Sequence, residues 1–498
     1  MNTDVMGARK SFGNLSVQET IDLAQGISAG PRRATSAAAV KTGIAAGSYL
    51  YGYPLEDPSK KLYFIEDALR RRIPRKVNPQ GGVAAHWKVI TAINSAKVKA
   101  GVAEGAVNTA VTLATAEKSQ TYRTLNMYNT YTDESKFFGR NFEDIPQLGM
   151  LVTLQDLMMQ EDRYLIGGTD VTIGAPATVV AADSGAVGTF ANVPYYIVVS
   201  ALTLHGYLNA AKGRITGTDA VDESIGTPNT GGTVTPTGSH GMTIYWADVP
   251  GAFAYNVYIG TAAYASATYN CTCTRNLVTV TDPTAAGTGV TNLADQTADQ
   301  YGYEGLIQQL VTLTGTAGST GSYGTKTAYY KDNAGVAPTA DGAGGCVEIE
   351  TMLQSIWNNY RISPTLLFLN AQEAKSLKKL SIGSSTANAV RIVVTPDGKN
   401  EFGAGSAVNA YWNPYTAQWI DIVTSVHMAP GKVFAIGETV PYPQSETPNN
   451  LEVDLQQEYY GELFARTTRS TPVGVTCIGA LKLYLPGACG IISNLAAA

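Results

Sequence analysis

Polar and apolar residues alternate at period two through the middle of the chain, which is the pattern of β-strands. Residues 241–260 contain two such runs, one ending at Trp246 and one carrying Tyr255, Val257 and Ile259, with turn residues 248–251 between them. An apolar run at 194–202 and a Gly/Thr/Pro-rich connection at 225–239 accompany them. We therefore predict a two-sheet sandwich over about 171–292 with these four side chains in its core. The alternative is an ordinary hairpin in a β-rich domain.

The pattern changes to a helical period outside that segment. Residues 142–165 place five apolar side chains on one side and predict the longest helix, ending at Gly167-Gly168: Leu148, Leu151, Leu154, Met158 and Leu165. Shorter helices are predicted over 57–72, over 346–360 and from Asn370, where Asn370 and Glu373 have the spacing of a capping box. The acidic pairs at 66–67, 143–144 and 161–162 are expected to be surface charge on helices.

A long hairpin is predicted over residues 83–132. Residues 86–93 lead outward, the tip near 95–107 is rich in Gly, Ala and Lys, and 109–132 return with polar alternation. A two-stranded ribbon alone is marginally stable in water, so we expect this one to lie on its own chain or on a neighbour. The chain ends in strands predicted over 365–369, 419–423, 432–436, 451–464 and 473–485.

The composition indicates a folded protein with an uneven charge. The chain has 498 residues, enough for about three domains, and 44% of them are hydrophobic. Residues 1–100 hold 15 Lys and Arg against 7 Asp and Glu, which is +8, whereas the whole chain carries −5 and the remainder therefore −13. A basic first fifth suggests an end that faces a polyanion or an acidic neighbour.

Basic residues cluster at a few places that are candidates for contact with neighbouring subunits or DNA: Arg32, Arg33, Arg70, Arg71, Arg72, Arg75 and Lys76, together with Lys97 and Lys99 near the hairpin tip. For the group at 60–76, a solvated helix end closed by cations explains the sequence equally well. For the two tip lysines, simple solvation is the favoured interpretation.

The sequence offers little support for catalysis, a metal or a membrane. The five cysteines are odd in number and lack metal-binding spacing, which predicts reduced thiols in a protein folded in cytoplasm. The Gly-x-Ser-x-Gly pattern around Ser28 lacks the strand-to-helix context of a hydrolase, and the glycine-rich run at 315–327 lacks the Gly-Lys of a phosphate loop. We expect no enzyme activity, no cofactor, no metal and no membrane span.

The order of these parts resembles that of the tailed-phage major capsid proteins, whose HK97-like fold is named after phage Hong Kong 97. In that α+β family an N-terminal arm, an extended loop, a spine helix, a peripheral domain and an axial domain follow one another. The arm corresponds to about 1–60, the extended loop to 78–132 and the spine helix to 142–167. Residues 356–369 resemble the entry to the axial domain, and residues 457–466 a late strand of the peripheral domain. The runs around Trp246 and Tyr255 resemble strands of immunoglobulin-like and fibronectin type III sandwiches.

The resemblance implies four parts: an arm at 1–60, the extended loop and spine helix at 61–170, an immunoglobulin-like insertion at 171–292, and the rest of the capsid core at 293–498. It further implies a virion protein, assembled in the host cytoplasm into hexamers and pentamers of an icosahedral head around double-stranded DNA. Expected partners are further copies of the chain, portal and scaffold proteins, decoration proteins and non-specifically bound DNA. The alternative is a surface adhesin or carbohydrate-binding protein built around the sandwich.

Overall fold

The computed structural model describes residues 66–78, 81–92, 101–108, 114–138, 145–210, 222–284, 295–299, 301–313, 328–342, 344–382, 409–440, 449–466 and 468–497. The chain divides into two compact units, Met1–Phe64 and Ile65–Ala498, and all described residues belong to the second. The predicted arm with Arg32, Arg33 and Ser28 lies outside the described residues, as do Lys97, Lys99 and the glycine-rich run at 315–327.

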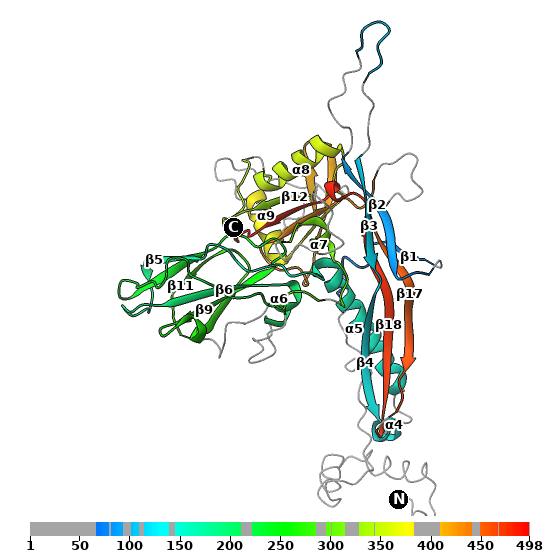
Figure 1. Cartoon of the computed structure of the whole chain (residues 1–498), viewed down its shortest axis with the longest axis horizontal. Helices are drawn as coiled ribbons and strands as arrows, with labels where there is room; N and C mark the ends of the chain where they lie inside the picture. Colours follow the sequence, from blue (N-terminus) through cyan, green and yellow to red (C-terminus); the bar gives the residue numbers. More distant parts are fainter. Residues whose placement is uncertain are drawn as a thin grey trace, which may run out of the picture. The chain divides into compact units, whose positions relative to one another are not determined.

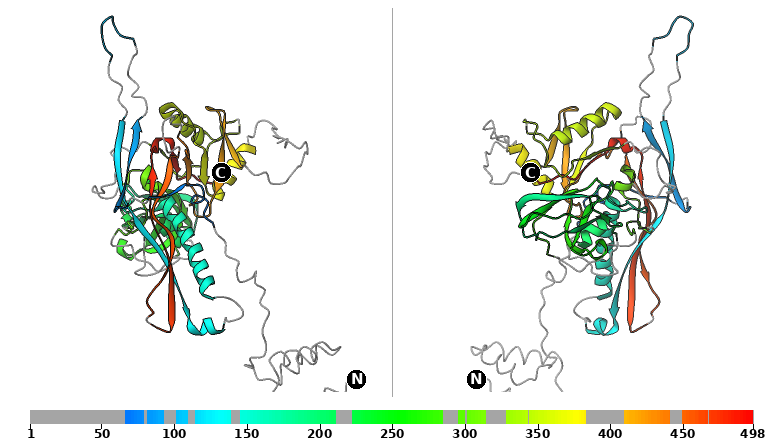
Figure 2. Two further views of the ribbon diagram at one scale, coloured as in Figure 1. Left: turned by 90° about the vertical axis from the view of Figure 1, so that its right-hand side faces the viewer. Right: turned by 60° about the vertical axis from the view of Figure 1, so that its left-hand side comes forward.

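The long strands predicted near the C-terminus form a four-stranded sheet (Figure 1). Its order is β1 (Arg75–Val77), β17 (Leu451–Leu463), β18 (Ser470–Leu483) and β4 (Arg123–Thr132). β1 runs parallel to β17, and the other neighbours are antiparallel. The helix α5 (Ile145–Gly167) packs beside β4 and β18 in every view (Figure 1, Figure 2). Leu157 of α5 shares a hydrophobic core with Val453 and Leu481.

The strands predicted over 365–369, 419–423 and 432–436 lie together in a six-stranded sheet. Its order is β12 (Tyr329–Asp332), β19 (Gly490–Ser493), β16 (Val433–Ile436), β13 (Leu366–Leu369), β15 (Gln418–Thr424) and β14 (Ala410–Asn413). The helices α8 (Val347–Tyr360) and α9 (Ala371–Ile382) supply Leu353 and Leu377 to the core on one face, beside Leu367. Leu366 and Phe368 point to the other face and join the core beneath α5. Short α4 (Asp133–Phe138), α7 (Leu306–Leu310) and η4 (Pro486–Ala488) complete these parts.

Residues 180–280 form a sandwich of two sheets around their own hydrophobic core. One sheet has the order β10 (Thr268–Cys273), β9 (Ala254–Gly260), β6 (Tyr196–Leu202) and β7 (Thr227–Pro228). The other has β11 (Leu277–Val280), β8 (His240–Tyr245) and β5 (Val180–Val187), and the short η3 (Tyr264–Ser266) lies between β9 and β10. Trp246, Tyr255, Val257 and Ile259 are all buried in the core between the two sheets.

The sandwich is joined to the rest of the unit by close packing. Leu204 in α6 (Leu204–Ala210) and Phe253 before β9 are buried in the same core as Leu157 of α5. A Cβ atom on Gly167 would approach Leu204 Cβ to 2.5 Å. The glycine at the end of α5 therefore allows α6 to pack directly against it. The segment 171–292 therefore contributes side chains to a core outside the sandwich, which its strand pattern does not indicate.

The structure confirms the predicted hairpin where residues 84–92 pair with 114–121. The prediction is wrong for residues 123–132, which pair with a different strand. β2 (Ala84–Ala92) pairs antiparallel with β3 (Ala114–Thr121) as a separate two-stranded sheet. The returning chain then leaves β2, because β4 pairs with β18 from Arg123 to Thr132. Buried Leu125 on β4 gains a place in the main core by this exchange of partners. The return strand predicted over 109–132 is thus divided between two sheets.

The helix predicted over 57–72 is also wrong in its described part. Residues 68–72 form hydrogen-bonded turns, in which Arg71 N–H donates to Asp67 O at 3.1 Å and Ile73 N–H to Leu69 O at 3.2 Å. Pro74 follows directly, and proline disfavours a helical residue before it. Arg70, Arg71 and Arg72 therefore belong to a tight turn leading into β1.

Glu373 is buried near the start of α9. The helix is capped by Asn370, whose Oδ1 accepts the Gln372 N–H at 3.0 Å. Glu373, expected in a capping box, accepts the Gly431 N–H at 2.7 Å through Oε1. Burial raises the pKa of Glu373 to about 7, although the Gly431 hydrogen bond acts in the opposite direction. The carboxyl group thus holds a proton more tightly in the folded chain than in the unfolded one.

We expect Glu373 to make the fold less stable as pH rises from about 4.5 to about 7. In that interval the folded state binds more protons than the unfolded state, so raising the pH favours unfolding. Between pH 5 and pH 8 this group should lower the free energy of unfolding by roughly 2 to 3 kcal/mol. Urea unfolding of wild type and Glu373→Gln at both pH values isolates this contribution. An identical pH dependence in both proteins would contradict it.

Candidate subunit-contact site

The predicted basic group lies on residues 66–78, here named the arm root because the described chain begins there. Its turn leads into β1, which continues along β17 with Arg75 opposite Val453. Val453 N–H donates to Pro74 O at 2.9 Å, and Asn78 N–H donates to Leu455 O at 2.8 Å. Leu69 and Ile73 are buried in the main core. Backbone pairing and apolar packing thus fix both ends of the arm root.

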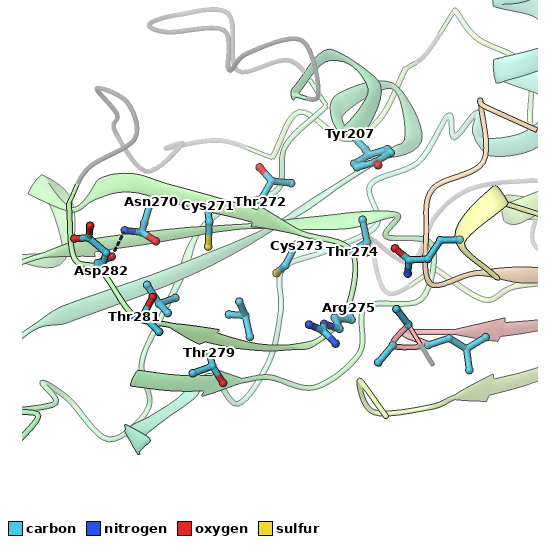
Figure 3. A pocket seen from close by; sticks show the side chains of 16 residues that line it. Tyr207, Asn270, Cys271, Thr272, Cys273, Thr274, Arg275, Thr279, Thr281 and Asp282 are labelled. Atoms are coloured by element: carbon cyan, nitrogen blue, oxygen red, sulfur yellow. Dashed lines mark hydrogen bonds between the residues drawn. The ribbon is translucent and has the colours of Figure 1, made fainter. Parts of the chain in front are cut away.

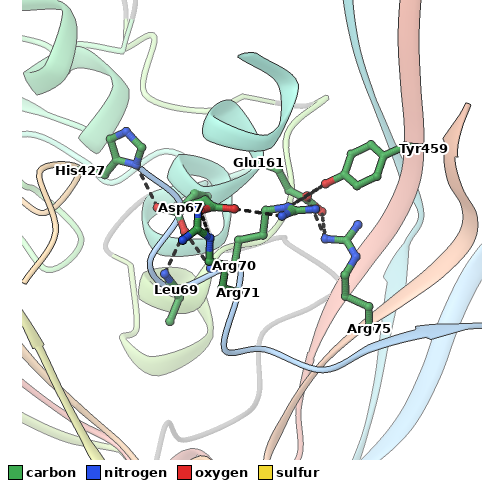
Figure 4. Close-up of polar contacts among 9 residues, drawn as sticks. Asp67, Leu69, Arg70, Arg71, Arg75, Glu161, His427 and Tyr459 are labelled. Atoms are coloured by element: carbon green, nitrogen blue, oxygen red, sulfur yellow. Dashed lines mark hydrogen bonds and ion pairs between the residues drawn. The ribbon is translucent and has the colours of Figure 1, made fainter. Parts of the chain in front are cut away.

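Glu161 on α5 lies at the centre of a buried charge cluster (Figure 4). Its side chain is 0% exposed, although the sequence predicted surface charge at this position. Arg70 Nε donates to Glu161 Oε2 at 2.9 Å, and Arg75 Nη1 donates to Oε1 at 3.0 Å and to Oε2 at 2.9 Å. Tyr459 on β17 donates its hydroxyl to the same carboxylate. One carboxylate therefore joins α5, the arm root and β17.

Asp162, the next residue of α5, holds the backbone of the arm root. Its side chain is also 0% exposed. Asp162 Oδ1 accepts the N–H groups of Leu69 at 3.1 Å and Arg70 at 2.8 Å, which lie in the first turn and therefore have no carbonyl partner within it. Asp162 Oδ2 lies 2.9 Å from Nδ1 of His427, in the loop before β16. Asp162 therefore joins a third segment to the same place.

The cluster keeps its two guanidinium groups charged despite their burial. Burial by itself would lower the pKa of Arg70, but Tyr459 and Glu161 raise it above its ordinary value. Burial likewise opposes the charge of Arg75, and Glu161 raises the pKa of that guanidinium. Burial and the neighbouring Glu161 raise the pKa of Tyr459, so its phenol remains a donor. Removing one member of such a cluster leaves an uncompensated buried charge and is far more costly than breaking a solvent-exposed pair.

The predicted contact residues separate into internal and external groups. Arg70 and Arg75 pair with Glu161 within the chain and are 12% and 18% exposed, so contact of these two residues with a neighbour or DNA stays a prediction. Arg72 is half-buried and pairs with Asp421 at 3.2 Å and Glu438 at 3.5 Å. Arg71 is 63% exposed and bonds Asp67, and Lys76 is exposed on β1. Arg71 and Lys76 are thus the members of the group that face solvent in the described unit.

Sequence reasoning missed Glu161 and Asp162 although one signal was present. Glu161 follows Leu154 and Leu157 by seven and four residues and precedes Leu165 by four, which places it on the apolar side of the helix. A charged residue within an apolar stripe is rarely fully buried without a partner. The basic turn at Arg70 and Arg75 was the available partner, but only the folded chain brings it to α5.

A second buried ion pair fixes the base of the hairpin. Lys118 Nζ on β3 lies 2.6 Å from Glu304 Oε2, and the lysine nitrogen is 5.4 Å from the centre of the Trp87 ring. Trp87 on β2 donates its Nε1–H to Leu483 O on β18 at 3.0 Å. Burial lowers the pKa of Lys118, while Glu304 opposes that shift. The two strands of the hairpin are therefore anchored at their base before the chain leaves the sheet.

A cavity lies beside the two edge strands of the sandwich (Figure 3). Its volume is about 700 Å³, and its walls come from β10, β11, Tyr207, Gln372 and the chain near Leu495. Four of the lining residues carry threonine hydroxyls: Thr272, Thr274, Thr279 and Thr281. Burial raises the pKa of Cys271 in this wall to about 11, which keeps its sulfur a thiol at neutral pH.

Further chemistry is limited among the residues that the structure describes. In that part of the chain no three His, Cys, Asp or Glu side chains come together as a metal site. All five cysteines are free, and burial raises the pKa of Cys346, Cys477 and Cys489 to about 12. Among the described helices, none combines the length and the hydropathy that crossing a membrane requires.

Neighbouring arginines of the arm root should respond very differently to the same substitution. We expect Arg70→Gln to lower the free energy of unfolding by about 3 to 5 kcal/mol, because it leaves buried Glu161 short of a cation. Arg71→Gln removes a guanidinium that is 63% exposed and should cost less than about 1 kcal/mol. Chemical denaturation measures both values. Equal losses for the two variants would show that the buried cluster does not stabilise the arm root.

Comparison with known proteins gives similar solved structures only. No protein-family model matches the chain, and no curated protein matches it. The match with the capsid of a native GTA particle covers 91% of this chain and 98% of that capsid chain, at 9% identity and a TM-score of 0.39. The match with the capsid of Myoviridae phage XM1 covers 89% of this chain and 100% of that one, at 9% identity and a TM-score of 0.35. The match with a chain from Mycobacterium phage Adephagia covers 92% of this chain and 96% of that one, at 10% identity and a TM-score of 0.37. The solved structures to which the chain is similar thus include phage and GTA capsids.

Proposed function

We propose that this chain is the major capsid subunit of a tailed phage or related particle. Copies would assemble into hexamers and pentamers of an icosahedral shell that encloses double-stranded DNA. The mechanism is geometric: parts that one subunit cannot cover alone are covered by its neighbours. Portal, scaffold and decoration proteins would be separate partners, and assembly would take place in the host cytoplasm.

The outer half of the long sheet is the observation that carries this proposal. α5 packs on β4 and β18, yet most residues of β4 and of the second half of β17 remain wholly or partly exposed. Large apolar side chains are exposed there: Tyr128, Phe137, Leu151, Leu463 and Phe464. Large apolar side chains exposed on neighbouring elements are the kind of surface that another protein can cover. In a shell, neighbouring subunits would cover these apolar side chains. In a monomeric enzyme or binding module they would stay exposed to water.

The hairpin supports the same proposal in a different way. Its base is fixed by Lys118 and Trp87, and every described residue of its tip, 101–108, is exposed. A segment with an anchored base and an uncovered tip can lie across an adjacent subunit. The arm root is anchored in a similar way, because the buried charge cluster fixes the chain immediately after residues 1–65.

The exposed cations of the arm root fit two roles in a shell. Arg71 and Lys76 could lower the repulsion of packaged phosphate groups by loose, sequence-independent contact, together with Arg32 and Arg33 of the arm. Pairing with acidic surfaces of neighbouring copies is the second role, and the −13 on residues 101–498 favours it. We favour subunit contact because residues 66–78 lie in the sequence between the predicted arm and the hairpin, the two segments expected to overlap neighbouring copies.

The sandwich would be an immunoglobulin-like decoration of the outer surface. The strand order β10-β9-β6-β7 facing β11-β8-β5, around a core containing Trp246 and Tyr255, supports this proposal. The cavity of about 700 Å³ beside β10 and β11 is the feature that would favour the alternative, an adhesin or carbohydrate-binding protein. Its hydroxyl-rich wall offers hydrogen bonds, but Tyr207 is the aromatic residue available for stacking among its lining residues.

Electron microscopy of the expressed chain, with and without a co-expressed scaffold protein, tests the proposal. We expect closed shells or ring-shaped capsomers, with a knob of density for each sandwich, and nuclease-resistant DNA in particles recovered from an infected host. A folded monomer under all these conditions would contradict the proposal. A monomer that binds immobilised glycans would instead support the adhesin.

A further inference from the structure

Two tryptophans at the edge of the six-stranded sheet form an exposed aromatic pair. Trp412 on β14 lies directly opposite Trp419 on β15, and their ring centres are 4.9 Å apart with planes at 65°. Trp412 is 45% exposed and Trp419 is 66% exposed. β14 is the last strand on that side of the sheet in the described chain. The pair thus combines the residue type most enriched at interaction hot spots with a position at an open edge.

The alternation of side chains explains why the pair is uncovered. Tyr411 and Ile420 point to the face covered by α8 and α9, so Trp412 and Trp419 point to the opposite face. On that same face the central strand β13 places Phe368 in the main core. The core therefore covers the middle of this face, and the tryptophans continue it beyond the covered region.

The turn that joins the two strands of the pair is fixed by hydrogen bonds. Asn413, the fully buried last residue of β14, donates its Nδ2–H to Ser363 Oγ at 2.9 Å. Thr416 Oγ1 lies 3.2 Å from the same hydroxyl, and Tyr415 N–H donates to Asn413 Oδ1 at 3.0 Å. These bonds fix the backbone of the turn that joins β14 and β15, so that backbone need not be ordered when a partner binds.

We propose that the aromatic pair is a contact surface for a second copy of this chain and that it receives the exposed side of α9 from that copy. The inference rests on the proposed function and names a contact within it. α9 presents Lys375 and Lys379, both exposed, while its Leu377 packs into the sheet. Asp421, on the same face as Trp419, is 62% exposed and pairs with Arg72, which Glu438 also contacts, so the receiving side carries two carboxylates against one guanidinium. An ammonium group placed over an indole ring is attracted by its π electrons.

The area of the pair also favours assembly over a simple dimer. With Tyr415, which is exposed in the same turn, the three rings offer roughly 350 Å². A stable two-body interface needs about 800 Å² from each partner. The pair is therefore sufficient only as one part of a larger contact. The acidic aromatic side and the basic α9 side lie on opposite faces of one sheet, so each copy can give one side and receive the other, as in a closed ring.

Tryptophan fluorescence and assembly together test this inference. Trp87 and Trp246 are buried, and Trp357 on α8 is partly buried, so the test is made in a Trp357→Phe background, where acrylamide should quench chiefly the exposed pair of the free subunit. We expect quenching to fall several-fold when subunits of this background assemble. Trp412→Thr/Trp419→Thr and, separately, Lys375→Glu/Lys379→Glu should fold normally by circular dichroism but need at least ten times the wild-type concentration to assemble. Tyr245→Thr, which removes an exposed aromatic from the sandwich, is the matched control and should assemble as wild type does.

The outcomes separate this inference from the proposed function. If wild type, control and both double variants assemble at one concentration, or if quenching is unchanged in shells, the contact is refuted while the capsid role stands. If only the tryptophan variant fails, the receiving surface is right and α9 is not its occupant, which overturns the proposal as stated. Protection that appears only when another protein is added to finished shells also overturns it. If wild type stays a folded monomer, the proposed function fails and this contact fails with it.

Discussion

The burial of two adjacent carboxylates on one helix is the constraint on which the described fold depends. Glu161 and Asp162 are both fully buried, and an unpaired carboxylate cannot remain ionised there at acceptable cost. Their partners come from the arm root, from β17 and from the loop before β16. Packing of α5 on the long sheet therefore requires that these three segments also be in place. Apolar burial stabilises the helix, and the carboxylates decide what it must pack against.

This arrangement explains how a rigid frame can carry extensions that it does not itself cover. The charge cluster fixes the start of the described chain, and the pair of Lys118 with Glu304 fixes the hairpin base. Both are buried, so salt screens them much less than surface pairs. What leaves the frame, at the hairpin tip and along the outer half of the long sheet, is exposed. The proposed capsid role needs this property, because copies must exchange extensions without losing their own fold.

Local pattern predicted much of the secondary structure but few of the contacts that organise it. Period-two and helical runs located α5, α8, β13, β17 and β18 to within a few residues, because each buries one face. The same reasoning kept 109–132 in one hairpin, since only the distant residues 470–479 draw β4 away. It identified Arg70 and Arg75 as a basic group but gave them an external role. The partner carboxylate lies 86 residues beyond Arg75, and no local pattern reveals that pairing.

Hydrogen exchange at the arm root tests the central claim most directly. The amide hydrogens of Leu69 and Arg70 lie in a turn and are bonded to Asp162 rather than to an ordinary helix or sheet. The account predicts that a peptide covering 66–73 exchanges as slowly as the core strand β17 in the wild-type chain. It also predicts that Asp162→Asn accelerates exchange there by at least tenfold while β18 stays protected. Fast exchange at 66–73 in the wild-type chain would contradict the account.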